Sequence, residues 1–518
     1  DTVKRVSASV GPEQEYFLID KDVYEKRKDL IYTGRTLYGA KPPKGQELED
    51  HYFGTIKPRV LAYMKDLNDE LWKLGILAKT EHNEVAPAQH ELAPIFTTTN
   101  IATDHNQLTM EIMQKVAARH GLVCLLHEKP FAGVNGSGKH NNWSISTDEG
   151  VNLLSPGETP HDNAQFLLFL CAVIKAVDDY QDLLRISVAT AGNDLRLGAQ
   201  EAPPAIVSIF LGDELNAVLE SLENDTPYCG VKKTKMKLGV DVLPKFTKDN
   251  TDRNRTSPFA FTGNKFEFRM VGSADSIACA NIMLNSAVAE SLRVYADYLE
   301  QAPDFQSALQ EMLKNTIKEH KRIIFNGNGY DDAWIQEATL KRGLSNYPST
   351  PDCVPHILDR KNVELLTGQK IYTEPELRAR YEIVLENYCK SIVIEANTMV
   401  DMAEKEILPA ITAYAMELAK TAAAKKALNE QITCAFECER VKTLSALTDE
   451  IALKIQELKK SLISLKSTET VCEESAFIRD QVLVKMRELR VPCDEAETIT
   501  ARKYWPFPTY GELLFGVK

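Results

Sequence analysis

The sequence predicts an α+β protein whose mixed amino-terminal half is followed by a mostly helical carboxy-terminal half. Over about the first 270 residues, short β-like runs such as GPEQEYFLI, HNNWSIST and KFEFRMVG alternate with helical stretches and with Gly- and Pro-rich loops. From about residue 276 the apolar residues recur at helical spacing, as in ANIMLNSAVAESLRVYADYLEQ. A chain of 518 residues of which 44% are hydrophobic can bury a large core.

The helical half contains two long patterns and an aromatic tail. Residues 376–425 predict one or two long helices, and LTDEIALKIQELKKSLISLKS resembles a heptad-like hairpin arm. For that arm we favour the core of an ordinary helix bundle over a coil dedicated to a partner. The tail YWPFPTYGELL is expected to dock on a surface of the same chain or of a neighbouring subunit.

The composition argues against several classes of protein. A formal net charge of -13 disfavours a large nucleic-acid or anionic-membrane surface, so we expect no nucleic-acid and no membrane partner. No apolar run approaches the roughly 18 residues that span a bilayer, and DTVKRVSASV lacks the apolar core of a signal peptide. The ten Cys are scattered, which predicts reduced thiols and a cytoplasmic enzyme.

Three predicted strands carry polar groups on one face and apolar groups on the other. Side chains alternate along a strand, so Glu13 and Glu15 of GPEQEYFLID share a face, opposite Tyr16 and Leu18. The same alternation gives two further polar faces, in KFEFRM and KHNNWSIS: Lys265, Glu267 and Arg269 in one, and His140, Asn142, Ser144 and Ser146 in the other. A solvated outer face would explain any single strand. Three of them beside a Gly-rich loop favour a polar cavity lined by strands.

The carboxylates on these faces point to divalent cations. HNEVAPAQHEL adds Glu84 and Glu91, in a Pro-containing segment that favours a loop. With Glu13, Glu15, Glu267 and His140 they would make a very acidic cavity, and buried like charges repel unless they are compensated. Carboxylate-rich sites suit Mg²⁺, and one imidazole makes the set tolerant of Mn²⁺.

Basic side chains near such a cluster indicate an anionic substrate. The candidates are Arg196, Arg253, Arg255, Lys265 and Arg269. Bound metals and arginines are what phosphoryl transfer requires, because that chemistry depends mainly on alignment and on charge neutralisation. No GxxxxGK[ST] loop is present, so a nucleotide would be held through its metals and a different kind of pocket.

An ordered set of motifs resembles glutamine synthetase, and its wording resembles the type III branch. The motifs are GPEQEYFLID, EHNEVAPAQHELAP, NGSGKHNNWSIS, RLGAQEAPPAIVSIF, RNRTSPFAF and NKFEFRM, over residues 11–272. The resemblance implies a catalytic domain built on a curved antiparallel sheet, like that of glutamine synthetases and guanido kinases, over residues 1–325. It implies an extended helical region specific to the type III branch over residues 326–518.

The resemblance also implies a reaction, a set of partners and an assembly. Glutamate would attack the terminal phosphate of ATP to give γ-glutamyl phosphate, and ammonia would then displace phosphate to give glutamine. Two or three Mg²⁺ or Mn²⁺ ions per site are expected, sorted into two ligand sets: Glu15, Glu84 and Glu91 in one, and Glu13, His140 and Glu267 in the other. Members of the family form double rings with active sites between subunits, so we expect a homododecamer of two hexameric rings.

By the same resemblance the remaining motif residues take substrate and nucleotide roles. Asn135, Gly136 and Arg196 would hold the amino-acid end of glutamate. Arg255 would neutralise the transferring phosphoryl group, and Arg269 matches an arginine that contacts both the substrate and the phosphate. Glu201, in QEAP, matches a flap glutamate that closes the site and accepts a proton from ammonium. The nucleotide contacts are expected from Phe96, Asn142, Ser144 and Lys265. Glu81, His82 and His90 are expected to orient loops rather than to bind metal.

Three departures from the family pattern keep alternatives open. Position 260 is Ala where an arginine is usual, and Lys265 stands where Arg is commoner. The family's β-grasp domain, which supplies an aspartate to the ammonium site, has no counterpart before GPEQE; we expect it either outside the printed chain or lost in a truncated or split form. The alternative functions are a γ-glutamyl-amine ligase and a catalytically incomplete ligand-binding scaffold.

Overall fold

The computed structural model describes residues 3–228 and 256–517 and contains one large sheet. Along the sheet the strands follow the order β2-β3-β1-β6-β9-β8-β7, and β4 and β5 pair with β1. The strand bounds are β1 Val6–Asp20, β2 Ala78–Asn83, β3 Gln89–Pro94, β4 Thr97–Thr98, β5 Leu122–Leu125, β6 Gly138–Thr147, β7 Ile209–Phe210, β8 Phe259–Phe261 and β9 Phe266–Gly272. The predicted α+β class and antiparallel sheet are confirmed, except that β7 and β8 pair in parallel.

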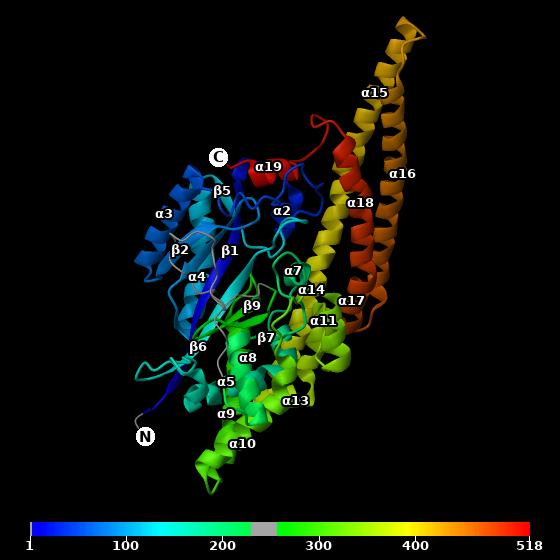
Figure 1. The fold of residues 1–518 in the computed structure, drawn as a ribbon. Coiled ribbons are helices and arrows are strands. Elements are labelled where there is room, and N and C mark those ends of the chain that lie inside the picture. Colours follow the sequence, from blue (N-terminus) through cyan, green and yellow to red (C-terminus); the bar gives the residue numbers. More distant parts are fainter. Residues whose placement is uncertain (1–2, 229–255, 518) are drawn as a thin grey trace.

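Helices cover the apolar face of the sheet (Figure 1). At the β1 end, Tyr16 and Leu18 pack against α3 (Pro58–Lys73) and α4 (Thr99–Arg119). At the β6 and β9 end, Trp143, Phe266 and Phe268 lie in the largest core with α5 and α9. The other helices of this half are α1 Lys21–Tyr24, α2 Lys28–Thr33, α5 Ala164–Asp179, α6 Gln181–Ile186, α7 Ala191–Arg196, α8 Asp213–Asn224, α9 Ala278–Glu300 and α10 Phe305–His320. The alternation read from the strands therefore separates a packed face from a polar face.

A second core belongs to the helical half of the chain. Two long helices occur where they were predicted, α14 (Glu374–Met402) and α15 (Leu408–Leu428), and a π-helical turn (Ala403–Ile407) joins them. The remaining α-helices are α11 Asp332–Gln336, α12 Thr350–Cys353, α13 Arg360–Gly368, α16 Ala435–Ser464, α17 Val471–Phe477, α18 Leu483–Ile499 and α19 Tyr510–Phe515. The largest core already includes residues from this half up to Leu385, and the second core begins at Tyr388 along α14. The boundary between residues 325 and 326 stays a prediction.

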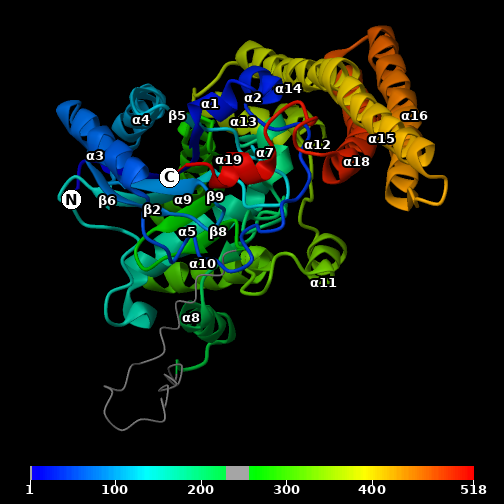
Figure 2. The same ribbon diagram turned by 90° about the horizontal axis from the view of Figure 1, so that it is seen from above.

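The arm and the tail both pack within the chain. Helices α15 and α16 project together from the body (Figure 1), and Leu447, Ile451 and Leu458 of α16 are buried in the second core. This arrangement agrees with a bundle core rather than a coil kept for a partner. The tail docks on the same chain, and the ribbon of α19 lies against the body of the molecule (Figure 2). Phe507 lies in the second core, and Tyr510 of α19 shares a core with Phe17 and Ile19 of β1.

None of the helices within residues 3–228 and 256–517 combines the length and the apolar character that crossing a membrane requires.

Candidate active site

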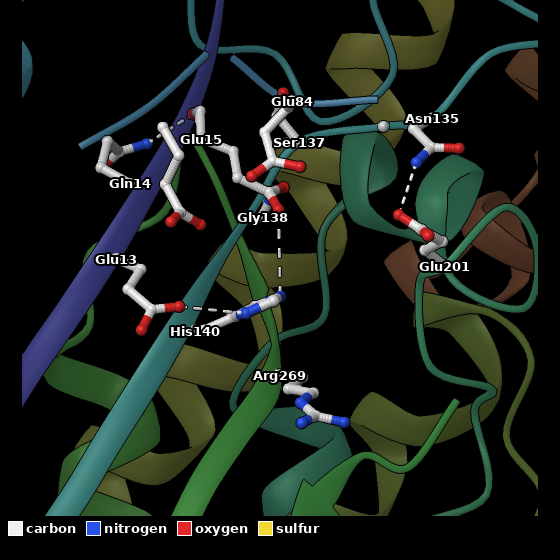
Figure 3. Close-up of polar contacts among 12 residues, drawn as sticks. Glu13, Gln14, Glu15, Glu84, Asn135, Ser137, Gly138, His140, Glu201 and Arg269 are labelled. Atoms are coloured by element: carbon white, nitrogen blue, oxygen red, sulfur yellow. Dashed lines mark hydrogen bonds and ion pairs between the residues drawn. The ribbon is translucent and has the colours of Figure 1, made fainter. Parts of the chain in front are cut away.

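The polar face of the sheet forms the floor of a cavity of about 270 Å³. Strands β1, β3, β6 and β9 supply the floor, and the rest of the lining comes from β2, from α7 and from loops between the elements. Eleven of its lining residues were predicted as site residues: Glu13, Glu15, Glu84, Glu91, Asn135, Gly136, His140, Arg196, Glu201, Glu267 and Arg269. Figure 3 shows most of them converging from separate elements.

The first group of candidate ligands is Glu13, His140 and Glu267. Because β1 and β6 pair with Glu13 opposite His140, the imidazole Nδ1 lies 3.2 Å from Glu13 Oε2 (Figure 3). The same nitrogen lies 3.0 Å from Glu267 Oε1. Burial alone would lower the pKa of His140, but hydrogen bonds to these two carboxylates raise it well above its ordinary value. Without a cation, a protonated imidazole therefore supplies the positive charge between the two carboxylates.

The second group consists of His82, Glu84 and Glu91, whose candidate ligand atoms lie within 4.8 Å of one another. His82 Nε2 is 3.0 Å from Glu91 Oε1. Burial, together with the charges of Glu15 and Glu91, raises the pKa of Glu84 to about 8. A carboxyl that stays protonated at neutral pH indicates that the nearby positive charges do not balance the negative charges of the site.

Glu15 lies between the two groups rather than within either of them. Its Oε2 accepts a hydrogen bond of 2.6 Å from the Gly138 backbone N–H, and its Oε1 is 3.9 Å from His140 Nε2. Burial raises the pKa of Glu15. The resemblance grouped Glu15 with Glu84 and Glu91 and left His82 to orient a loop, whereas the geometry adds His82 to the donors beside those two carboxylates.

The donor set fits one or more hard divalent cations. The two groups offer carboxylate oxygens and two imidazoles, and protons on Glu84 and His140 now offset the clustered negative charge. Carboxylates suit Mg²⁺, and imidazole also suits Mn²⁺. A third group, Asp178, Asp179 and His320, is compensated differently, because Arg322 and Lys175 form ion pairs with its carboxylates.

The Gly-rich loop NGSG allows Arg196 to approach the cavity floor. Arg196 ends α7 and is 3% exposed. Its Nη2 donates to the Arg269 carbonyl at 3.0 Å, and a Cβ added at Gly138 would lie 2.1 Å from the same nitrogen. A Cβ at Gly136 would lie 2.4 Å from the Glu128 carbonyl oxygen. Glycine is therefore required at both positions for this packing.

Glu201 enters the cavity from a strained loop that follows α7. Gln200 and Glu201 have φ values of 53° and 69°, a region that residues other than glycine rarely occupy. The Glu201 carboxylate accepts a hydrogen bond of 2.8 Å from Asn135 Nδ2 (Figure 3). Strain of this kind is held in place by surrounding contacts and is common at functional sites.

Arg269 is fixed beside the first group of ligands. Its Nε and Nη2 donate to the two oxygens of Glu267, at 3.0 Å and 3.3 Å. Burial opposes ionisation of Glu267, but His140 and Arg269 together hold its pKa far below the ordinary range. Ala260, the position where the family usually has an arginine, is fully buried on β8 and pairs with Glu267. Arg253 and Arg255 lie outside the described residues.

The predicted nucleotide residues do not line this cavity but continue the same face of the sheet. Asn142 donates to Glu13 Oε1 at 3.0 Å, and Ser144 donates to the Asn264 carbonyl at 2.9 Å. Phe96 is 68% exposed and borders Gly11, the β1 residue paired with Asn142. Lys265 immediately precedes β9.

Several lining residues were not predicted as site residues: Tyr52, His82, Gln89, Gln200 and Ala202. Gln89 could have been predicted, because it lies in HNEVAPAQHE between two predicted ligands. In the structure its amide donates to the Gly136 carbonyl at 2.9 Å. Tyr52 lies in a segment without a periodic pattern, and nothing local indicated that it reaches the cavity.

The fold and the cavity define an enzyme-like site, in which two carboxylate–imidazole groups share a floor with buried arginines. Comparison with known families gives matches to "Glutamine synthetase, catalytic domain" over residues 3–189 and to "Glutamine synthetase C-terminal domain" over residues 308–426.

Curated relatives match over nearly the whole chain. The "Glutamine synthetase" of Butyrivibrio fibrisolvens is 51% identical over 100% of this chain and 74% of that protein. The "Type-3 glutamine synthetase" of Dictyostelium discoideum is 47% identical over 99% of this chain and 70% of that protein. The "Glutamine synthetase" of Bacteroides fragilis is 42% identical over 99% and 72%, respectively. The chain belongs to the glutamine synthetase family.

Proposed function

We propose that this chain is an ATP-dependent glutamate–ammonia ligase, a glutamine synthetase of the type III branch. The observation that carries the proposal is the convergence of Glu13, Glu15, Glu84, Glu91, His140 and Glu267 with Glu201 and Arg269 in one cavity. This convergence occurs in a chain that is 42% to 51% identical to named glutamine synthetases over nearly its full length. The reaction joins glutamate and ammonia, converts ATP to ADP and releases phosphate.

The donor groups favour two or three Mg²⁺ or Mn²⁺ ions, held by Glu13, His140 and Glu267 on one side and by Glu15, Glu84 and Glu91 on the other. When bound, these ions supply charge neutralisation and alignment of the ATP phosphates. His82 is a candidate additional ligand, because its Nε2 faces Glu91. The nucleotide base and sugar would follow the face marked by Phe96, Asn142, Ser144 and Lys265.

The chain's own side chains would orient glutamate and manage its protons. Arg196 lies at the cavity wall with Asn135 and Gly136, where it can pair with the α-carboxylate. Arg269 is preorganised by Glu267 and stabilises negative charge on the phosphoryl group, with Arg255 assigned the same role by resemblance alone. Glu201 accepts a proton from ammonium, so that ammonia can displace phosphate from γ-glutamyl phosphate. A closed cavity keeps that acyl phosphate from water.

We also propose that the catalytic unit spans residues 1–325, with the helical region at 326–518, and that the chain assembles as a dodecamer of two hexameric rings. The basis for both is the resemblance to the type III branch. A cytoplasmic location is proposed from the cysteines, since the nine that lie in the described residues are all free. Mass photometry of the purified chain would test the assembly.

A coupled assay tests the reaction. The chain is incubated with glutamate, ATP and Mg²⁺, with and without ammonium, while phosphate and glutamine are followed. Ammonium-dependent glutamine formation at equal stoichiometry with phosphate is expected. Product from methylamine but not from ammonium would instead identify a γ-glutamyl-amine ligase. Binding of ADP and Mg²⁺ without any turnover would identify a ligand-binding scaffold.

A further inference from the structure

Gln46 reaches the candidate active site from a loop that no motif marks. It lies between α2 and α3, in a stretch without a long helix or strand, and it is only partly buried. Two hydrogen bonds of 2.8 Å join it to Asn135: the Asn135 backbone N–H donates to Gln46 Oε1, and Gln46 Nε2 donates to Asn135 Oδ1. The Gln46 side chain is therefore hydrogen-bonded to both the main chain and the side chain of Asn135, a proposed substrate-binding residue.

The same loop is fastened to the metal-ligand side of the cavity. His51 Nδ1 lies 2.6 Å from the Glu84 carbonyl oxygen, and Asn83 Nδ2 donates to the His51 carbonyl at 3.1 Å. Within the loop, the Glu49 backbone N–H donates to the Gln46 carbonyl at 3.0 Å. Gln46 therefore approaches Asn135 from a loop that His51 ties to the backbone beside Glu84.

The chemistry at the two ends of this chain of hydrogen bonds fixes which way each amide points. A backbone N–H can only donate, so Gln46 must present its oxygen to Asn135 N and its amide nitrogen to Asn135 Oδ1. Asn135 must then direct its own amide nitrogen away from Gln46, toward Glu201. Glu201 Oε2 is a carboxylate oxygen and accepts that bond at 2.8 Å (Figure 3). Reversing either amide would set two acceptors against each other.

We propose that Gln46 is a positioning residue for the ligase reaction: it fixes the amide of Asn135 so that the Asn135 N–H group is directed at the Glu201 carboxylate. This inference rests on the proposed function, because Glu201 matters here as the acceptor of a proton from ammonium. The bond holds the Glu201 carboxylate in one place in the cavity. It also anchors a loop whose backbone is strained at Gln200 and Glu201.

Two substitutions separate positioning from packing. Gln46→Ala removes both hydrogen bonds, so residue 46 no longer fixes the orientation of the Asn135 amide. Gln46→Glu keeps the size and the bond from Asn135 N, but a carboxylate cannot donate to Asn135 Oδ1. The Asn135 amide would then turn its nitrogen to residue 46 and its oxygen to Glu201, where two acceptors would meet.

The expected order of damage is therefore wild type, then Gln46→Ala, then Gln46→Glu. Loss of neutral hydrogen bonds predicts a fall of about 3- to 10-fold in kcat/KM for ammonium and a similar rise in the glutamate Kd for Gln46→Ala. In Gln46→Glu the charge-assisted bond from Asn135 to Glu201 is lost and replaced by repulsion. For this variant we expect changes of about 10- to 150-fold in the same two quantities. The Kd for ADP with Mg²⁺ should stay within about twofold in all variants, because the nucleotide face does not include Gln46.

Leu48→Glu is the matched control, since it adds the same charge to the same loop at a side chain that is 75% exposed. It should behave like the wild type. Equal effects of Gln46→Ala and Gln46→Glu, or an equal effect of Leu48→Glu, would overturn the inference. If the wild type binds glutamate but forms no glutamine, the proposed function is refuted, and the order of the glutamate Kd values among the variants still tests the role of Gln46. A wild type that binds no glutamate defeats both.

Discussion

Replacing Glu84 with Gln should remove about one proton from those released when a divalent ion binds at pH 7. Burial and the charges of Glu15 and Glu91 raise the pKa of Glu84 to about 8. At pH 7 such a group carries a proton about nine-tenths of the time. A carboxylate must be ionised to hold a metal, so binding expels that proton.

The sign and size of the pH dependence follow from the same pKa. Below pH 8 each unit of acidification adds about 1.4 kcal/mol to the cost of ionising Glu84, so the ion should bind about tenfold more weakly per unit. Above pH 8 this contribution disappears. His140 acts in the same direction, because its pKa is also raised and its proton must leave before Nδ1 can bind an ion.

The assay is calorimetric titration of Mn²⁺ into the intact chain at pH 7, in two buffers that differ in ionisation enthalpy. The difference between the buffers gives the number of protons released. Wild type minus Glu84→Gln should be about 0.9 proton. Glu300→Gln, at an exposed position that ends α9, is the matched control and should release as many protons as the wild type.

The reasoning would be refuted by wild-type binding that releases no proton at pH 7 and has the same Kd at pH 6.5 and 8. If Glu84→Gln binds no ion at all, the wild-type pH slope alone decides. A slope of at least one decade per pH unit below pH 8 is expected, and a flat profile would show that Glu84 is ionised before the ion arrives.

Three further predictions concern stability, the tail and turnover. Burial raises the pKa of Glu81 to about 8, so the ionisation of this group opposes folding as the pH rises above about 4.5. Glu81→Gln should therefore leave the melting temperature unchanged at pH 5 and raise it by a few degrees at pH 8. The exposed control Glu300→Gln should change the melting temperature at neither pH. Arg27 pairs with the buried Asp29 carboxylate and also contacts Pro508 and Phe507 of the tail. Arg27→Met leaves that carboxylate unpaired at a cost of about 3–5 kcal/mol, so residues 504–515 should become accessible to early proteolysis. A tail that stays intact under conditions that digest unfolded loops would contradict this. Glu201→Gln should lower ammonium-dependent glutamine formation by about 10²- to 10⁴-fold with ADP binding unchanged, and activity within tenfold of wild type would remove Glu201 from proton transfer.

The part of the site that lies on strands could be predicted from the sequence, because strand geometry is local. The period of two in GPEQEYFLID and NKFEFRM puts Glu13, Glu15 and Glu267 on polar faces, and the pairing of β1 with β6 and of β6 with β9 brings those faces together. The long helices α14 and α15 were predictable for the same reason, since their apolar spacing is visible within one segment.

The loop contributions could not be predicted in this way. Gln46 meets Asn135 across 89 positions of sequence, and Tyr52 reaches the cavity from the same irregular segment. No periodicity connects such residues, because a loop side chain is directed by tertiary contacts rather than by a repeating backbone geometry. Arg196 was predicted as a substrate contact, but its hydrogen bonds to the carbonyls of β9 could not be foreseen from its position in the chain.

The sheet is stable despite its acidic face because the apolar side chains on the opposite face of the same strands are buried against helices. Trp143, Phe266 and Phe268 are fully buried against the helices, and at about 25 cal/mol per Å² each such aromatic side chain contributes about 4–6 kcal/mol of hydrophobic stabilisation. The same packing sets the position of the ligands. A slip of one residue in the pairing of β1 with β6 would turn Glu13 and Glu15 into the helical layer and Tyr16 into the cavity. The apolar residues therefore fix the register, and the register fixes the distances between His140 and its carboxylates, so a core substitution that shifts β6 should alter ion binding without touching any ligand.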